Sequence, residues 1–148
     1  MMIPNRRFFG LFATTVMTAA LARSMTSAQA QTSAANNKVV FQMSDGESAK
    51  WSLALNNMHN LQVDLGGDQV DLELVAYGPG IGMLKADSPM AQRISDMLKT
   101  GAKLVACENT MKAMKLVHAD MLPGIGYVPS GVVELVRKQQ QGHAYIRP

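Results

Sequence analysis

Apolar and polar residues alternate along residues 38–148 with two different periods. Short runs rich in Val, Leu and Ile predict buried β-strands, whereas longer stretches with apolar residues three and four positions apart predict amphipathic helices. Segments with Gly, Pro and Ser separate the two kinds of stretch and predict turns. The predicted strands are residues 38–43, 68–78, 102–107, 124–129 and 143–148, and a predicted helix follows each of the first four.

Polar residues at the starts of these helices predict how the helices begin. Ser44 and Glu47 have the spacing of a capping box ahead of the first helix. Ser88 and Pro89 are suited to the N-cap and first turn of the second helix, and Ser130 is expected to cap the fourth. The expected apolar faces are Trp51, Ala54, Leu55, Met58, Leu61 and Leu65 in the first helix, Met90, Ile94, Met97 and Leu98 in the second, Met111, Met114 and Val117 in the third, and Val132, Leu135 and Val136 in the fourth.

Five strands that alternate with four helices predict an α/β domain with a mostly parallel sheet. Residues 38–148 are numerous enough to form one compact domain with its own core. In open sheets of this kind, ligands bind at the carboxyl ends of the strands. The residues that follow each predicted strand are therefore the candidates for function.

The N-terminal segment has the three parts of an export signal. Arg6 and Arg7 form a positive region, residues 11–22 are apolar, and residues 28–30 read Ala-Gln-Ala, the pattern of a cleavage site. The apolar run is too short to span a bilayer, so residues 1–30 are predicted to be a cleaved signal peptide that leaves no stable membrane anchor. The arginine pair also resembles a twin-arginine signal. Residues 31–37 are predicted to form a flexible tether, and the mature protein is predicted to be periplasmic or otherwise exported.

Export would change the net charge of the protein. The whole chain has 14 Lys and Arg against 11 Asp and Glu. Arg6, Arg7 and Arg23 precede the cleavage site and no acidic residue does, so the mature domain would carry equal numbers of both signs. A domain without excess charge has no general electrostatic affinity for nucleic acid, and no nucleic acid is expected as a partner.

Cys107 is the only cysteine in the chain. In an exported domain it cannot form an internal disulfide, so its thiol must be buried, paired with another chain or used chemically. Its predicted position, at the end of a strand and before a helix, favours a thiolate because helix N–H groups lower the pKa of a thiol. Glu108 opposes this effect by its charge, and free cysteine is often an ordinary core residue. The residues alone leave a reactive and a structural role open.

Other arrangements that could carry chemistry are weaker. His118 follows Cys107 by eleven residues, which is about 16 Å along a continuous helix and too far for a Cys–His catalytic pair. The methionines fall at helical core spacing, which favours packing over the remaining alternative of Cu(I) binding. No metal-binding or cofactor-binding motif stands out. Neither a metal nor a cofactor is predicted.

Four stretches of the chain carry a family resemblance. They read KVVFQMSDG, ELVAYGPGIGML, AKLVACENTMKAM and GYVPSGVVELVRKQQQGHAYIRP. In this order they resemble the DsrE/DsrF-like family, in particular its exported, single-domain branch. The resemblance implies a flavodoxin-like, three-layer α/β subunit that forms homo-oligomers, commonly trimers or hexamers. It also implies that the cysteine after the third strand, here Cys107, accepts sulfur as a persulfide from a donor protein and passes it to an acceptor protein.

A sulfur carrier needs an accessible thiolate and a few hydrogen-bond donors to stabilise the anion. Asn109 and Thr110 after the third strand, Tyr77 after the second and Asp45 after the first are the candidate substrate-binding residues, although each is also an ordinary cap or turn residue. Two hypotheses remain. The chain is either an exported sulfur carrier or sulfurtransferase-like protein that uses Cys107, or a non-catalytic homo-oligomeric module that binds a small ligand or a protein and has a structural cysteine. Whether it turns over as an enzyme stays open.

Overall fold

The computed structural model describes residues 37–148, and the predicted signal peptide and nearly all of the predicted tether lie outside this range. None of the helices in these residues is long and apolar enough to cross a membrane. The strands are β1 (Asn37–Met43), β2 (Val70–Ala76), β3 (Lys103–Cys107), β4 (Gly126–Val128) and β5 (Ala144–Ile146). The helices are α1 (Ser48–Leu65), α2 (Ala91–Lys99), α3 (Glu108–Ala113) and α4 (Gly131–Gln140), with 3-10 helices η1 (Gly67–Gln69), η2 (Gly78–Leu84) and η3 (His118–Asp120) in the connections.

The five strands form one sheet in the order β4-β3-β2-β1-β5, and all neighbouring strands are parallel. The prediction of a flavodoxin-like, three-layer α/β domain is therefore confirmed. β2 is central and is buried along most of its length, as expected for a parallel strand with helices on both sides. Because all strands are parallel, the last residues of β1, β2 and β3 lie at the same edge of the sheet. These residues are Met43, Ala76 and Cys107.

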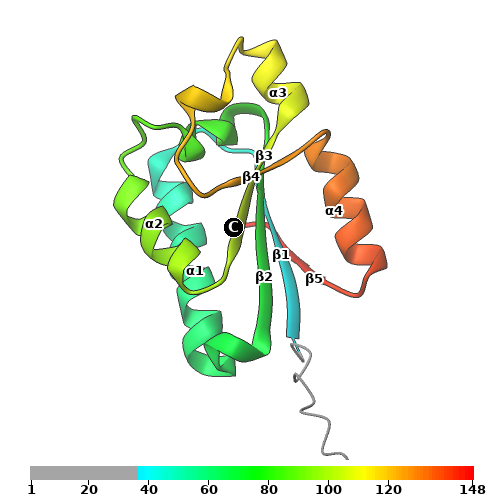
Figure 1. The fold of residues 1–148 in the computed structure, drawn as a ribbon. Helices are drawn as coiled ribbons and strands as arrows, with labels where there is room; N and C mark the ends of the chain where they lie inside the picture. The colour runs from blue at the N-terminus through cyan, green and yellow to red at the C-terminus, as the bar shows by residue number, and fades with distance from the viewer. Residues whose placement is uncertain (1–36) are drawn as a thin grey trace, which may run out of the picture. The chain divides into compact units, whose positions relative to one another are not determined.

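Helices cover the two faces of the sheet unequally. α1 and α2 lie on one face, whereas α4 alone lies on the other (Figure 1). The core under α1 and α2 contains most of the buried apolar side chains in residues 37–148. The core under α4 contains four buried residues, Val40, Val75, Val105 and Leu135. The face under α4 is thus thinly covered.

The predicted capping box at the start of α1 is wrong. The helix begins at Ser48 with Glu47 in the cap position, and no side chain caps it. Ser44 Oγ instead accepts a hydrogen bond from Gln42 Nε2 at 3.1 Å. Its carbonyl oxygen accepts the Gly80 N–H at 3.2 Å, so Ser44 stabilises the connection after β2 rather than α1.

The other two predicted caps are partly correct. Ser88 Oγ accepts the Met90 N–H at 3.2 Å, but α2 begins only at Ala91. Pro89 therefore precedes the helix instead of occupying its first turn. Ser130 does occupy the N-cap position of α4, although its side chain makes no capping hydrogen bond.

The third helix is much shorter than predicted. α3 ends at Ala113, and the chain turns at Lys115, which has a positive φ of 56°. Met111 is buried as expected, but Met114 and Val117 are exposed. Met111, Met114 and Val117 have the spacing of a continuous helix, but the helix ends before Met114 and the chain turns at Lys115.

The predicted apolar face of α4 is also only partly correct. Leu135 is buried, whereas Val132 and Val136 are exposed. The spacing identifies an apolar stripe, but the sheet beneath α4 offers a contact surface for only part of it. Leu65 at the end of α1 is exposed in the same way, while the rest of the predicted α1 face is buried or partly buried.

At Gly80, the backbone of η2 packs closely against the end of β1. A Cβ at this position would lie 2.3 Å from the carbonyl oxygen of Met43 and 3.0 Å from the Cα of Ser44, both of which are backbone atoms. We expect Gly80→Ala to lower the free energy of unfolding by about 2–3 kcal/mol or more, as overpacking does. Gly67→Ala is the matched control, since its Cβ would meet nothing within 4 Å. Urea denaturation measures both, and equal stability of the two variants would contradict the close approach.

Candidate functional site

Cys107 is the last residue of β3 and directly precedes α3. After β3 the chain turns toward α1 and α2, where Met111 joins the larger core. After β4 it turns to the opposite face, where Leu135 joins the smaller core. Adjacent strands whose connections leave toward opposite faces mark the usual ligand position at the carboxyl edge of an open sheet. Cys107 lies at this divergence point and is 4% exposed.

Hydrogen-bond donors surround the Cys107 sulfur. Burial raises the pKa of the Cys107 thiol, but hydrogen bonds from the backbone N–H of Gly131, from the hydroxyl and N–H of Thr110 and from the N–H of Asn109 outweigh burial and lower the pKa from its usual value of 9.0. The donors come from the first turn of α3 and from the start of α4. At a given pH, the thiolate fraction of Cys107 is therefore higher than that of an ordinary cysteine.

Thr110 connects the thiol to the end of β2. Its Oγ1 accepts a hydrogen bond from the Gly78 N–H at 3.0 Å. A hydroxyl that accepts one hydrogen bond still has its own proton to donate, and the Thr110 hydroxyl donates it to Cys107. The N–H of Asn109 also donates to the Pro129 carbonyl oxygen at 3.2 Å, which joins the segments that follow β3 and β4.

Gly131 also lies beside Cys107, although the sequence pattern did not predict it as a site residue. A Cβ on Gly131 would lie 3.1 Å from Tyr77 Cβ, 3.2 Å from Tyr77 Cδ1 and 3.3 Å from Cys107 Cβ. The absence of a side chain therefore lets the start of α4 approach the sulfur. The only available signal was a glycine directly after the predicted cap Ser130, which is a common residue at the start of a helix.

The polar groups of the other two candidates, Tyr77 and Asp45, make their contacts away from the Cys107 thiol. The Tyr77 hydroxyl is hydrogen-bonded to Ser44, and burial raises the pKa of Tyr77. Only the Cβ and ring edge of Tyr77 lie beside Gly131 and Cys107. Asp45 Oδ2 is 3.8 Å from the Arg147 guanidinium, on the side of β5. The structure thus brings Cys107, Asn109 and Thr110 together, places the Tyr77 ring beside them, and gives Asp45 other contacts.

The contacts of His118 also lie away from the sulfur. Its ring stacks on Tyr127 with centroids 3.7 Å apart, and its Nε2 is 3.8 Å from Glu108 Oε1. Within residues 37–148, no group of three His, Cys, Asp or Glu side chains could hold a metal ion. The groups that lower the pKa of the Cys107 thiol are uncharged hydrogen-bond donors.

The chain belongs to the DsrE/DsrF-like family, which matches residues 16–148. It is 37% identical to MTH1491, a protein of unknown function from Methanobacterium thermoautotrophicum. That match covers 76% of this chain and 99% of the other, with a TM-score of 0.73. A comparison with curated proteins found no match.

Two more distant solved structures share the fold. BT1422 of Bacteroides thetaiotaomicron is a conserved protein of unknown function and is 14% identical, with a TM-score of 0.63 over 77% of this chain and 97% of the other. The YchN protein of E. coli is 12% identical, with a TM-score of 0.61 over 76% of this chain and 99% of the other. At these identities the likeness concerns the fold alone.

The lowered pKa of Cys107 makes stability depend on pH. Because the folded thiol releases its proton more easily than the unfolded thiol, ionisation stabilises the fold fully above the usual value of 9.0, and this contribution is lost as the pH falls through the folded pKa. We therefore expect the free energy of unfolding of the native protein to rise relative to that of Cys107→Ser as the pH increases toward 9.0. Urea denaturation of both, under reducing conditions from about pH 6 to about pH 10, measures the difference. A difference that stays constant with pH would contradict the lowered pKa.

Proposed function

We propose that the protein is an exported sulfur carrier that holds sulfane sulfur as a persulfide on Cys107. The DsrE/DsrF-like family is generally related to sulfur relay. The observation that carries the proposal is the set of donors from Asn109, Thr110 and Gly131 around the thiol. These donors favour the anion that must attack sulfur, and the N-terminal signal favours a periplasmic or otherwise exported location.

The proposed reaction needs no metal and no second cysteine. The Cys107 thiolate attacks the terminal sulfur of a polysulfide, a new S–S bond forms, and the shortened polysulfide leaves with the electron pair of the bond that breaks. An acceptor thiolate then attacks the outer sulfur of the persulfide and releases Cys107 as a thiolate. The form of Cys107 that attacks sulfur is an anion, and so is the persulfide that forms. The donors around Cys107 therefore stabilise a negative charge throughout the cycle.

The burial of the thiol favours a small sulfur donor at the loading step. Cys107 is 4% exposed, and the hydrogen bond between Asn109 and Pro129 joins the two segments next to it. Asn109 and Pro129 are themselves exposed. A polysulfide is far smaller than a protein, so it needs a smaller opening of these segments than a donor or acceptor protein would. We propose donor and acceptor proteins as partners on that condition.

Mass spectrometry of the intact protein tests the sulfur function. After exposure to polysulfide, we expect the reduced protein to gain the mass of one sulfur atom, to lose it with a thiol reductant, and to show no gain in Cys107→Ser. A thiol acceptor such as glutathione should remove the sulfur and appear as its persulfide. An unchanged mass in a folded protein with a free thiol would refute the carrier role and favour the alternative, a binding module with a structural cysteine.

We also propose that the subunit assembles into a homo-oligomer through the outer surface of α4. Val132, Val133 and Val136 are 55%, 46% and 48% exposed and belong to one short helix. Three exposed valines so close together are typical of a surface that a second protein covers. The thin cover over this face of the sheet supports the same assignment.

A charged residue on α4 tests this assembly. We expect Val133→Glu to shift the protein toward the monomer, because a carboxylate in an apolar interface must be dehydrated. Val63→Glu on α1 is the matched control, since Val63 is exposed but lies on the helix layer opposite α4. Size-exclusion chromatography with light scattering measures both masses. A monomeric native protein, or equal loss of assembly in both variants, would contradict the assignment to α4.

A further inference from the structure

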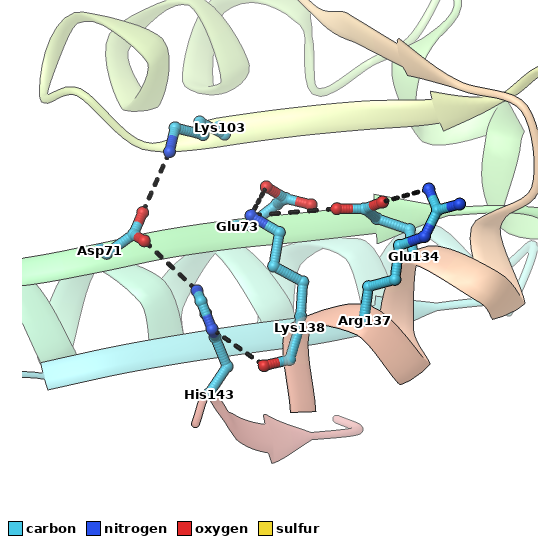
Figure 2. A network of polar contacts seen from close by, with 7 residues as sticks. All are labelled: Asp71, Glu73, Lys103, Glu134, Arg137, Lys138 and His143. Atoms are coloured by element: carbon cyan, nitrogen blue, oxygen red, sulfur yellow. Dashed lines mark hydrogen bonds and ion pairs between the residues drawn. The ribbon is translucent and has the colours of Figure 1, made fainter. Parts of the chain in front are cut away.

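Helix α4 is held at both ends by buried contacts. At its first residue, Gly131 lies so close to Cys107 that a Cβ built on it would be 3.3 Å from the Cys107 Cβ, and its N–H favours the Cys107 thiolate. Seven residues later, about 10 Å along the helix, the Lys138 ammonium lies 2.6 Å from Glu73 Oε2 on β2 (Figure 2). The Glu73 and Lys138 side chains are only 4% and 11% exposed. Charges are buried this deeply almost only where they are paired, because removing them from water is costly.

Further polar contacts fasten the same end of α4 (Figure 2). His143 Nδ1 lies 3.0 Å from the Lys138 carbonyl oxygen, and His143 Nε2 lies 3.3 Å from Asp71 Oδ2. Asp71 is also 3.2 Å from the Lys103 ammonium. Glu134 is 3.9 Å from Lys138 and supplies a second, more distant carboxylate. Charged groups thus tie the carboxyl-terminal end of α4 to β2.

Apolar packing does little to fix where α4 lies. Two residues of α4 are buried, Gly131 and Leu135, and only Leu135 has an apolar side chain to pack. The packing of one apolar side chain is non-directional and allows a helix to slide or tilt. A close, buried ion pair resists displacement, because separating its two charges would leave each of them unpaired away from water. The Glu73–Lys138 pair therefore fixes the far end of α4, and the rigid helix transmits that position to Gly131.

We propose that the Glu73–Lys138 ion pair is a positioning device that holds the start of α4 against Cys107, with the Gly131 N–H directed at the sulfur. The pair does not touch the thiol and acts through the helix. The inference rests on the proposed function, because what the position of Gly131 provides is a thiolate ready to accept sulfur.

The variant Glu73→Gln separates this mechanism from a direct effect of charge. Removal of a negative charge would by itself favour the thiolate and speed its reactions. If the pair positions α4, the effect is opposite, because Lys138 loses its buried partner, moves toward water, and lets Gly131 retreat from the sulfur. The thiolate then loses a charge-assisted hydrogen bond. Alkylation of Cys107 by iodoacetamide at a pH below the thiol pKa should slow about tenfold.

The experiment measures two quantities on the purified protein. The first is the alkylation rate as a function of pH, and the second is the NMR signal of the Gly131 amide. In the native protein that signal should follow the titration of the thiol, and in Glu73→Gln it should cease to follow it. Arg137→Gln is the matched control, because the exposed Arg137 neighbours Lys138 in sequence but pairs at 4.0 Å with Glu134. It should behave like the native protein.

A folded Glu73→Gln protein that is alkylated at the native rate or faster would overturn the proposal. If this variant does not fold, the double variant Glu73→Leu/Lys138→Met decides, because an apolar pair often packs as well as a buried ion pair. The double variant should alkylate within about threefold of the native rate, since α4 keeps its place without the charges. A tenfold loss in the folded double variant would also overturn the proposal. Alkylation does not depend on sulfur loading, so failure of polysulfide to load Cys107 would refute the sulfur function alone.

Discussion

A sulfur anion inside a protein is stable only where dipoles face it, and here those dipoles come from two segments that leave the sheet in opposite directions. Asn109 and Thr110 follow β3, whereas Gly131 follows β4. The parallel sheet makes this convergence possible because it sets the ends of β3 and β4 side by side. The hydrogen bond from Asn109 to Pro129 then joins the two segments. The acidity of the thiol is thus a property of the whole edge rather than of one helix.

The order and type of the elements could be predicted because each strand and helix carries its own local period. The end of β3 at Cys107 followed from the change between a run of apolar residues and a polar segment. The close contact of Gly131 with Cys107 could not be predicted, because the two residues belong to different connections and a glycine at a helix start has many other uses. The shortness of α3 was also hidden, because the residues after its turn keep helical spacing.

The role of Glu73 was equally inaccessible from sequence. Asp71 and Glu73 alternate with Val and Leu in β2, so both carboxylates read as the polar side of an alternating pattern. The partner of Glu73, Lys138, lies in a helix whose polar residues look like an ordinary solvated face. Only the packing of α4 over β2 shows that both charges are buried together. The same packing explains why the valines of α4 are exposed although their spacing is that of a core-facing stripe.

The path of α4 across the sheet links the thiol to the order in which the chain becomes structured. α4 connects β4 at one edge to β5 at the other, where Val39 pairs with Ala144 from the far end of the chain. The Gly131 N–H therefore reaches Cys107 only after α4 has closed over the sheet. Before that moment the thiol lacks one of its donors and is a weaker nucleophile. The Cys107 thiol of an unfolded chain is therefore less acidic than that of the folded protein, and folding itself makes the cysteine acidic.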